Sequence, residues 1–140
     1  MRFMAIVKGN EQSEAGALPD EAILAEMTTY NEELAKSGNL LAAEGLQPSS
    51  AGVRIRYEGS KRTVIDGPFA EAKELVAGYW LLQVRSREEA IEWLKRAPFQ
   101  DGEVELRPVH EAPDFGEAFT PELQERERRV AAQMAENAKQ

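Results

Sequence analysis

The chain has 140 residues, of which 42% are hydrophobic and 30% are charged, a composition typical of one folded domain and not of a disordered chain. Its formal net charge of −8 argues against nucleic-acid partners, because phosphate backbones would be repelled over most of the surface. The absence of cysteine excludes disulfides and cysteine-based metal sites, and no apolar run is long enough to span a membrane. We therefore expect a cytoplasmic domain.

The N-terminal third predicts a strand, a loop, a helix and a second strand. Residues 2–8 alternate as a strand does but are apolar on both faces, so we expect a strand covered on both sides. A polar loop is predicted over residues 9–17. A helix then begins at Pro19-Asp20 and ends at Lys36-Ser37-Gly38. Its core-facing stripe is Ile23, Met27, Tyr30 and Leu34. Residues 40–43 form the second strand, which ends at Glu44-Gly45.

The middle of the chain predicts a hairpin and then the strongest strand. Residues 53–57 and 62–66 alternate in character around a reversal at 58–61, which favours a hairpin with one solvated face. Residues 66–69, Asp-Gly-Pro-Phe, have turn chemistry. Residues 75–84 are apolar on both faces, so this strand is expected at the centre of the sheet.

The C-terminal third predicts two helices and a last strand. Ser86 and Glu89 have the spacing of a capping box, and the helix that they open is stopped by Pro98. Residues 103–109 form the last strand. Thr120 and Pro121 begin a final helix with a thin apolar stripe. We expect a domain over residues 1–113 and a helical extension over residues 114–140.

The order of elements predicts the fold. Strand, helix, strand, hairpin, strand, helix, strand is a ferredoxin-like βαββαβ plan of the α+β class with an inserted hairpin. Two helices can cover only one face of such a sheet, yet the first strand and the 75–84 strand are apolar on both faces. We expect a second subunit to cover the other face, in a homodimer with two-fold symmetry.

Two carboxylates are candidate catalytic residues. Asp66 ends a strand at a turn, where it could act as a general base or a polar anchor. Alternatively, it hydrogen-bonds the amides of its own turn. Glu44 lies between apolar strand residues and Gly45, so it is a candidate for a partly buried carboxylate. Its alternative role is an ion pair with a hairpin arginine.

A small-molecule pocket is the predicted binding site. Tyr30, Phe69 and Trp80 could form its walls. For Tyr30, Tyr79 and Trp80, the alternative is core packing at helix and strand spacing. Glu71 and Lys73 precede the central strand and could hold a polar ligand, or they could be a solvated loop. His110 is the only imidazole, so no metal site with several histidines can form, and we predict no metal and no cofactor.

The stretch Asp66-Gly67-Pro68-Phe69, followed by the apolar strand with Gly78-Tyr79-Trp80, resembles the YCII-related family in its Asp-Gly-Pro-Phe branch. The resemblance extends over residues 1–113. It implies a homodimer whose sheets pack face to face as a dimeric α/β barrel, with a small pocket in each subunit. Some relatives are enzymes that use a His-Asp pair, but this chain has no histidine in its first helix or second strand.

Two functions are therefore predicted. The first is binding of a small molecule in the pocket of a homodimer, with Asp66 or Glu44 as acid or base if the protein is a cofactor-independent enzyme. The alternative is a non-catalytic regulatory or protein-interaction dimer. The resemblance suggests this alternative, because members of the branch are often encoded beside an alternative sigma factor.

Overall fold

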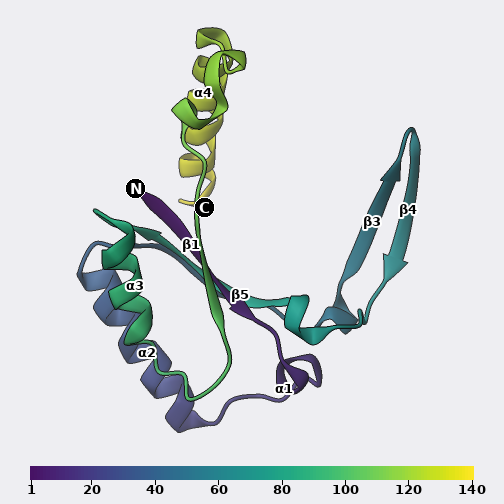
Figure 1. The fold of residues 1–140 in the computed structure, drawn as a ribbon, viewed down its shortest axis with the longest axis vertical. Helices are drawn as coiled ribbons and strands as arrows, with labels where there is room; N and C mark the ends of the chain where they lie inside the picture. Colours follow the sequence, from purple (N-terminus) through teal and green to yellow (C-terminus); the bar gives the residue numbers. More distant parts are fainter. The chain divides into compact units, whose positions relative to one another are not determined.

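In the computed structural model, the described residues are 1–72 and 74–140. The chain forms two compact units, Met1–Pro108 and Val109–Gln140. Figure 1 labels the main helices and strands. The elements of the first unit are β1 (Arg2–Lys8), α1 (Glu11–Glu14), α2 (Glu21–Lys36), β2 (Leu40–Gly45), β3 (Val53–Glu58), β4 (Lys61–Asp66), β5 (Val76–Gln83), α3 (Arg87–Lys95) and β6 (Val104–Pro108), with short 3-10 turns at Ser49–Ala51 and Ala72–Glu74. The second unit contains a 3-10 segment at Ala112–Ala118 and α4 (Pro121–Asn137).

The predicted α+β fold is confirmed by the strand order. Four strands form one antiparallel sheet in the order β2-β5-β1-β6, while β3 and β4 pair only with each other. Without the hairpin, the chain runs β1, α2, β2, β5, α3, β6, so the first strand and the third strand of the plan lie side by side at the centre of the sheet. This is the ferredoxin-like βαββαβ arrangement with an inserted hairpin.

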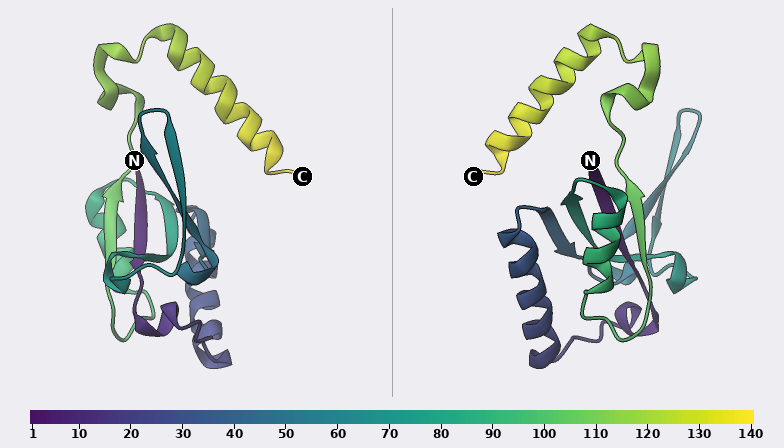
Figure 2. Two further views of the ribbon diagram at one scale, coloured as in Figure 1. Left: turned by 90° about the vertical axis from the view of Figure 1, so that its right-hand side faces the viewer. Right: turned by 60° about the vertical axis from the view of Figure 1, so that its left-hand side comes forward.

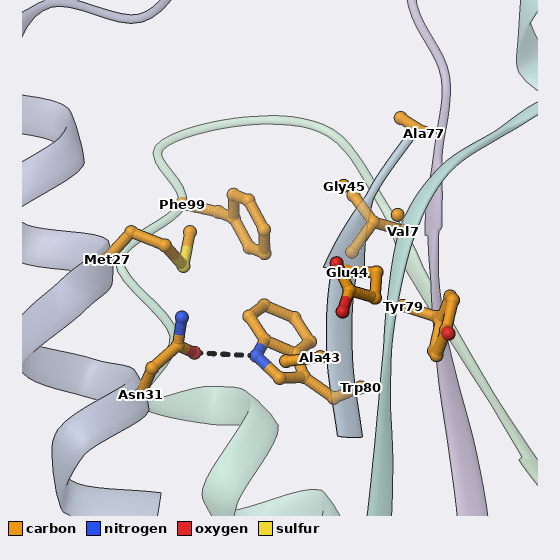
Figure 3. Close-up of a pocket in the computed structure, with 11 residues that line it drawn as sticks. Val7, Met27, Asn31, Ala43, Glu44, Gly45, Ala77, Tyr79, Trp80 and Phe99 are labelled. Atoms are coloured by element: carbon orange, nitrogen blue, oxygen red, sulfur yellow. Dashed lines mark hydrogen bonds between the residues drawn. The ribbon is translucent and has the colours of Figure 1, made fainter. Parts of the chain in front are cut away.

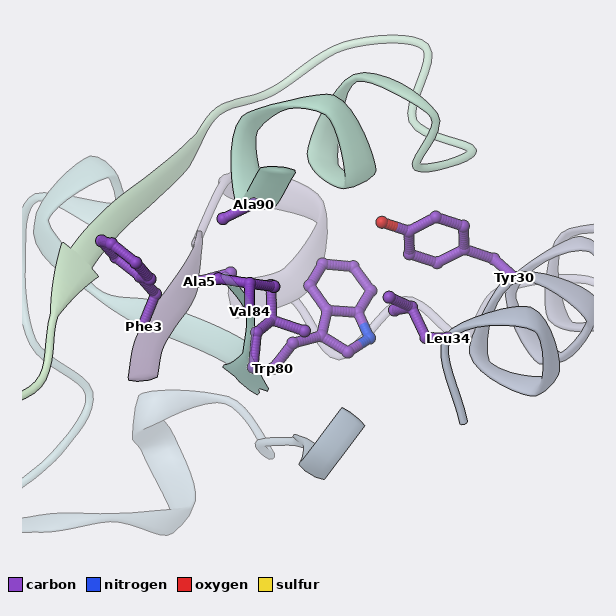
Figure 4. Close-up of a cluster of buried hydrophobic side chains, with 8 residues drawn as sticks. Phe3, Ala5, Tyr30, Leu34, Trp80, Val84 and Ala90 are labelled. Carbon is purple, nitrogen blue, oxygen red and sulfur yellow. The ribbon is translucent and has the colours of Figure 1, made fainter. Parts of the chain in front are cut away.

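The core lies between the sheet and the two helices α2 and α3, as Figure 4 shows. Because side chains alternate along a strand, β1 and β5 each turn one set of residues toward the helices. Leu82 and Leu34 are the largest fully buried side chains, and Ala90 of α3 completes the contact. The buried cluster consists of Phe3, Ala5, Tyr30, Leu34, Trp80, Leu82, Val84 and Ala90.

The opposite face of the sheet is also apolar at its centre. Register places Met4 opposite Leu81 and Ile6 opposite Tyr79, so these four side chains share one face. All four are half-buried, whereas the residues that face α2 and α3 reach full burial. The expectation that β1 and β5 are apolar on both faces is therefore confirmed.

The β3–β4 hairpin differs from the prediction of one solvated face. All six residues of β3 are exposed, and the two strands extend beyond the four-stranded sheet as a separate ribbon (Figure 2). Only Thr63 and Ile65 of β4, which share the face of Arg54 and Arg56, are half-buried, so neither face of the hairpin is fully buried in the single chain. Alternation indicates which side chains share a face, but it cannot say whether anything packs on that face.

Local signals give the helix boundaries, with two corrections. The predicted loop 9–17 contains the short helix α1, because the Asn10 side chain accepts a hydrogen bond from the Ser13 amide. At α3, the Ser86 side chain accepts from the Glu89 amide as predicted. However, the Glu89 carboxylate accepts from the amide and the guanidinium of Arg85, which also lowers its pKa. Half of the capping box is therefore replaced by contacts to Arg85.

The second unit contains the predicted C-terminal helix. The Thr120 side chain caps α4 by accepting from the Leu123 amide, and Pro121 is its first residue. Among the described residues, no helix combines the length and the apolar character that crossing a membrane requires.

Candidate functional site

A pocket with a volume of about 290 Å³ lies beside the β2 edge of the sheet, between α2, the β2–β5 pair and the loop that follows α3 (Figure 3). Its size is near the lower end of the range for small-molecule sites. Its lining residues are Val7, Met27, Asn31, Ala43, Glu44, Gly45, Ala77, Gly78, Tyr79, Trp80 and Phe99.

Two glycines leave room for this pocket. Gly45 of β2 lies directly opposite Gly78 of β5, so the sheet carries no side chains at that point. A Cβ atom at Gly78 would lie 2.9 Å from the carbonyl oxygen of Glu44, which is too close for any other residue without a shift of the strand. Gly78 therefore allows the backbone of β2 at Glu44 to lie close to β5 at the edge of the pocket.

One wall of the pocket is the indole of Trp80, which is only 4% exposed. Its ring packs edge-on against the Phe99 ring, with 5.9 Å between the ring centroids. The indole Nε1–H donates to Oδ1 of Asn31 over 2.7 Å. Because the indole N–H can only donate, this bond fixes which way the Asn31 amide lies.

The fixed amide presents a hydrogen-bond donor to the pocket. With Oδ1 held by Trp80, the amide nitrogen of Asn31 lies on the side of Met27 and Phe99, as Figure 3 shows. Asn31 is half-buried and Met27 packs against the core, so this donor lies beside apolar atoms. A ligand oxygen that accepts from Asn31 would gain more there than at a fully solvated site.

Glu44 supplies the carboxylate of the pocket. Register places it opposite Tyr79 on the edge strand β2, so its side chain shares the open face of the sheet with Tyr79, on the other side from Trp80, and it is exposed. The prediction of a partly buried carboxylate is therefore wrong in the single chain, because no further strand lies beyond β2. An exposed acid at a pocket rim can still bind or exchange a proton with a ligand.

Tyr30 belongs to the core and does not line the pocket. Its hydroxyl donates to the carbonyl oxygen of Trp93 over 2.6 Å, and its ring packs edge-on against Trp80 at 5.6 Å. Burial raises the pKa of Tyr30 to about 12, because the phenolate would lose its hydration. Core packing, the alternative considered for Tyr30, describes its place in the fold.

The raised pKa of Tyr30 predicts a loss of stability at alkaline pH. An unfolded tyrosine has its ordinary pKa of 10.0 and the folded Tyr30 a pKa of about 12, so the stabilisation is complete below pH 10 and is lost as the pH rises from 10 to 12. Urea unfolding at increasing pH should show a steeper decline for the wild type than for Tyr30→Phe. Tyr57→Phe, a change at a 66% exposed side chain, should keep the wild-type slope. Parallel curves for wild type and Tyr30→Phe would contradict this account.

Asp66 lies away from the pocket. It is exposed at the end of β4, opposite Val53, and it is not among the residues that line the space beside Trp80. The amides of the following turn bond elsewhere: Gly67 donates to the Gly52 carbonyl oxygen over 2.9 Å, and Phe69 donates to Oγ of Ser49 over 3.0 Å. The structure thus separates the two predicted catalytic acids, Asp66 and Glu44.

The remaining predicted ligand contacts also lie outside the pocket. The guanidinium of Arg54 stacks over the ring of Phe69 at 3.8 Å, at the base of the hairpin. Glu71 is exposed and has a left-handed backbone with a φ of 66°. Lys73 lies outside the described residues. Of the predicted binding residues, Trp80 alone lines this pocket among those that the structure describes.

Sequence reasoning missed Asn31, Met27 and Phe99. The sequence pattern places Met27 in the core-facing stripe of α2, and Asn31 lies one turn further along the same helix. The signal that could have located the pocket was the pair Gly45 and Gly78, each placed in a strand where glycine is unfavourable without a reason. In the described part of the chain, no group of three or more His, Asp or Glu side chains is arranged to hold a metal ion.

Comparison with known proteins identifies the family. The model of the YCII-related domain matches residues 1–113. An uncharacterized protein of Rhizobium meliloti is 30% identical over 93 residues, which are 64% of this chain and 75% of that protein. Among solved structures, the 5-chloro-2-hydroxyhydroquinone dehydrochlorinase of Burkholderia phenoliruptrix AC1100, in complex with 2,5-dihydroxybenzoquinone, is 12% identical with a TM-score of 0.46, over 79% of this chain and 94% of that one. On the family match over most of its length, the chain belongs to the YCII-related domain family.

Proposed function

We propose that the protein binds a small molecule in the pocket beside Trp80, and that the ligand has an apolar, preferably flat, body and an oxygen that accepts a hydrogen bond. The observation that carries this proposal is the Trp80–Asn31 hydrogen bond of 2.7 Å, which turns the donor end of Asn31 to the pocket. The apolar body would pack against Trp80, Phe99 and Met27.

We also propose that the protein is a homodimer and that it belongs to the Asp-Gly-Pro-Phe branch of its family. The apolar open face of the sheet, around Met4, Ile6, Tyr79 and Leu81, supports the dimer, because a second sheet would remove these half-buried side chains from water. The sequence Asp66-Gly67-Pro68-Phe69, which follows β4, supports the branch.

A cofactor-independent acid–base reaction is the second candidate, and Glu44 would be its catalytic residue. Among the described residues that line the pocket, Glu44 is the sole carboxylate. Asn31 lies on the helix side of the sheet and Glu44 on the open side, so the substrate must extend around the β2 edge for Glu44 to take or return its proton. Asp66 has no part in this proposal, because it does not line the pocket.

The test is a thermal-shift screen with small carboxylic and aromatic acids, because a ligand that binds the folded state raises its apparent stability. The decisive variant is Asn31→Asp, which keeps an acceptor for the Trp80 indole but replaces the donor with a carboxylate oxygen. We expect it to weaken binding of a carboxylate by about tenfold or more, since a charged hydrogen bond is lost and a like charge faces the ligand. Titration followed by tryptophan fluorescence measures this change.

Glu32→Gln is the matched control, because Glu32 is the exposed neighbour of Asn31 on α2. It should bind as the wild type does. Glu44→Gln separates binding from catalysis. The variant should keep most of its affinity for the ligand in either case. If the protein is an acid–base enzyme, the variant should also lose the turnover that the wild type shows. A broad screen without any hit would contradict the proposal and favour the regulatory alternative.

A further inference from the structure

The β3–β4 hairpin, Val53–Asp66, has two chemically different faces. Register pairs Val53 with Asp66, Ile55 with Val64 and Tyr57 with Arg62, so these residues share one side of the ribbon. The apolar members of this side are Val53, Ile55, Tyr57 and Val64, which are 56%, 48%, 66% and 64% exposed. We call this side the apolar face of the arm, and the hairpin itself the arm.

The opposite side of the arm is basic. Arg54, Arg56 and Lys61 lie there with Glu58, Thr63 and Ile65. Arg62 belongs to the apolar face and stacks over the Tyr57 ring at 4.8 Å. Four of the 17 basic residues of the chain but only two of its 25 acids lie in residues 53–66. The arm is therefore positively charged in a chain with a net charge of −8.

An isolated two-stranded ribbon is at best marginally stable in water. In this chain, the arm is joined to the rest at its base, where the Gly67 amide donates to Gly52 and the Phe69 amide donates to Ser49. The guanidinium of Arg62 also donates to the carbonyl oxygens of Gly59 and Lys61 at the tip. These contacts hold the two ends of the ribbon and leave its apolar face exposed.

We infer that the arm docks by its apolar face on a second copy of this chain, an inference that rests on the homodimer of the proposed function. The charge distribution selects this occupant: residues 1–52 contain eight acids and three basic residues, so the body of a partner copy is complementary to the arm. The tail helix α4 is a poorer match, because its acids alternate with arginines and Glu125 already pairs with Arg128 at 2.6 Å. Two-fold symmetry makes the contact reciprocal, so each arm holds the other subunit.

The inference is tested by site-specific photocrosslinking. The chain has no cysteine, so Val64→Cys creates a single thiol, on the apolar face, that can carry a benzophenone probe. Val64→Cys protein of natural isotope composition, carrying the probe, is mixed with isotopically heavy wild-type protein. The mixture is irradiated and analysed by mass spectrometry. The expected result is a covalent dimer that joins light and heavy chains. Because the arm is basic, the yield should fall as salt is added.

Glu58→Cys is the matched control, because Glu58 is exposed on the opposite side of the same ribbon. It should give several-fold less dimer. Tyr57→Cys replaces Val64→Cys if the latter loses its wild-type circular dichroism spectrum. A probe at either apolar position that reacts only within its own chain, including residues 109–140, overturns the inference.

Light scattering on the same samples separates this inference from the proposed dimer. A dimer in solution without arm crosslinks would leave the sheet-to-sheet dimer intact and refute the arm contact. A stable monomer would refute both. Neither result bears on ligand binding in the pocket, which the Asn31→Asp titration tests independently.

Discussion

Replacing Gly67 with alanine should lower the free energy of unfolding by about 3 kcal/mol, a large effect for an added methyl group. A Cβ atom at this position would lie 1.8 Å from the carbonyl oxygen of Ser49 and 2.7 Å from its carbonyl carbon. Both atoms are backbone, so no rotation of a side chain can relieve the overlap. The base of the hairpin must therefore open or the segment around Ser49 must move.

The segment around Ser49 is itself held in place, which makes such a movement costly. Both the amide and the hydroxyl of Ser49 donate to the carboxylate of Glu14, and these hydrogen bonds lower the pKa of Glu14. The Ser49 hydroxyl oxygen also accepts from the Phe69 amide. A shift that accommodates a methyl group at Gly67 would disturb this chain of hydrogen bonds from α1 to the turn.

Urea unfolding of Gly67→Ala and Gly52→Ala measures this effect against a close control. A Cβ atom at Gly52 would lie 3.5 Å from the same Ser49 oxygen, which is an ordinary contact. Gly52→Ala should therefore stay within about 1 kcal/mol of the wild type. Equal stabilities of the two variants would show that the close packing at Gly67 does not hold in solution.

Replacing Leu81 with lysine should convert the proposed dimer into a monomer. Leu81 lies at the centre of the open face of the sheet, between Ala42 of β2 and Met4 of β1. If a second sheet packs there, the ammonium group would be buried without a partner, at a cost of several kcal/mol. Such a cost corresponds to a dimer dissociation constant that is about 100-fold or more higher.

Analytical ultracentrifugation over a concentration series measures the dissociation constant. Gln83→Lys is the control, because Gln83 is an exposed polar residue at the end of the same strand. It adds the same charge and should leave the dimer nearly unchanged. The monomer of each variant should have the same free energy of unfolding as the wild-type monomer, since Leu81 points away from the buried cluster. A wild type that is monomeric at micromolar concentration refutes the dimer outright.

The elements of the fold could be predicted because their signals are local. Alternation in residues 2–8 predicts β1, the apolar run in residues 75–84 predicts β5, and Thr120 with Pro121 predicts the start of α4. The prediction of a loop over residues 9–17 failed because of one local contact, the side-chain cap that starts α1. The helix α1 depends on the Asn10 cap in a stretch of polar residues, which carries no hydrophobic periodicity to reveal it.

The candidate site could be predicted only in part. Trp80 and Glu44 were predicted and do line one pocket, while Asp66 and Phe69 lie at the base of the hairpin. Turn chemistry made Asp66 conspicuous in the sequence, yet a turn says nothing about which pocket lies near it. Asn31 was inconspicuous because a single polar residue on a helix has no pattern of its own.

The sequence by itself determined the order of strands and helices, the βαββαβ plan and the two apolar faces of β1 and β5, because alternation, helical periodicity and capping act between neighbours along the chain. The tertiary structure decided where the pocket lies. Strand order sets Gly78 opposite Gly45, and α2 brings Asn31 to the Trp80 indole across 49 positions of sequence. Such a site depends on distances between remote residues, and no local pattern encodes those distances.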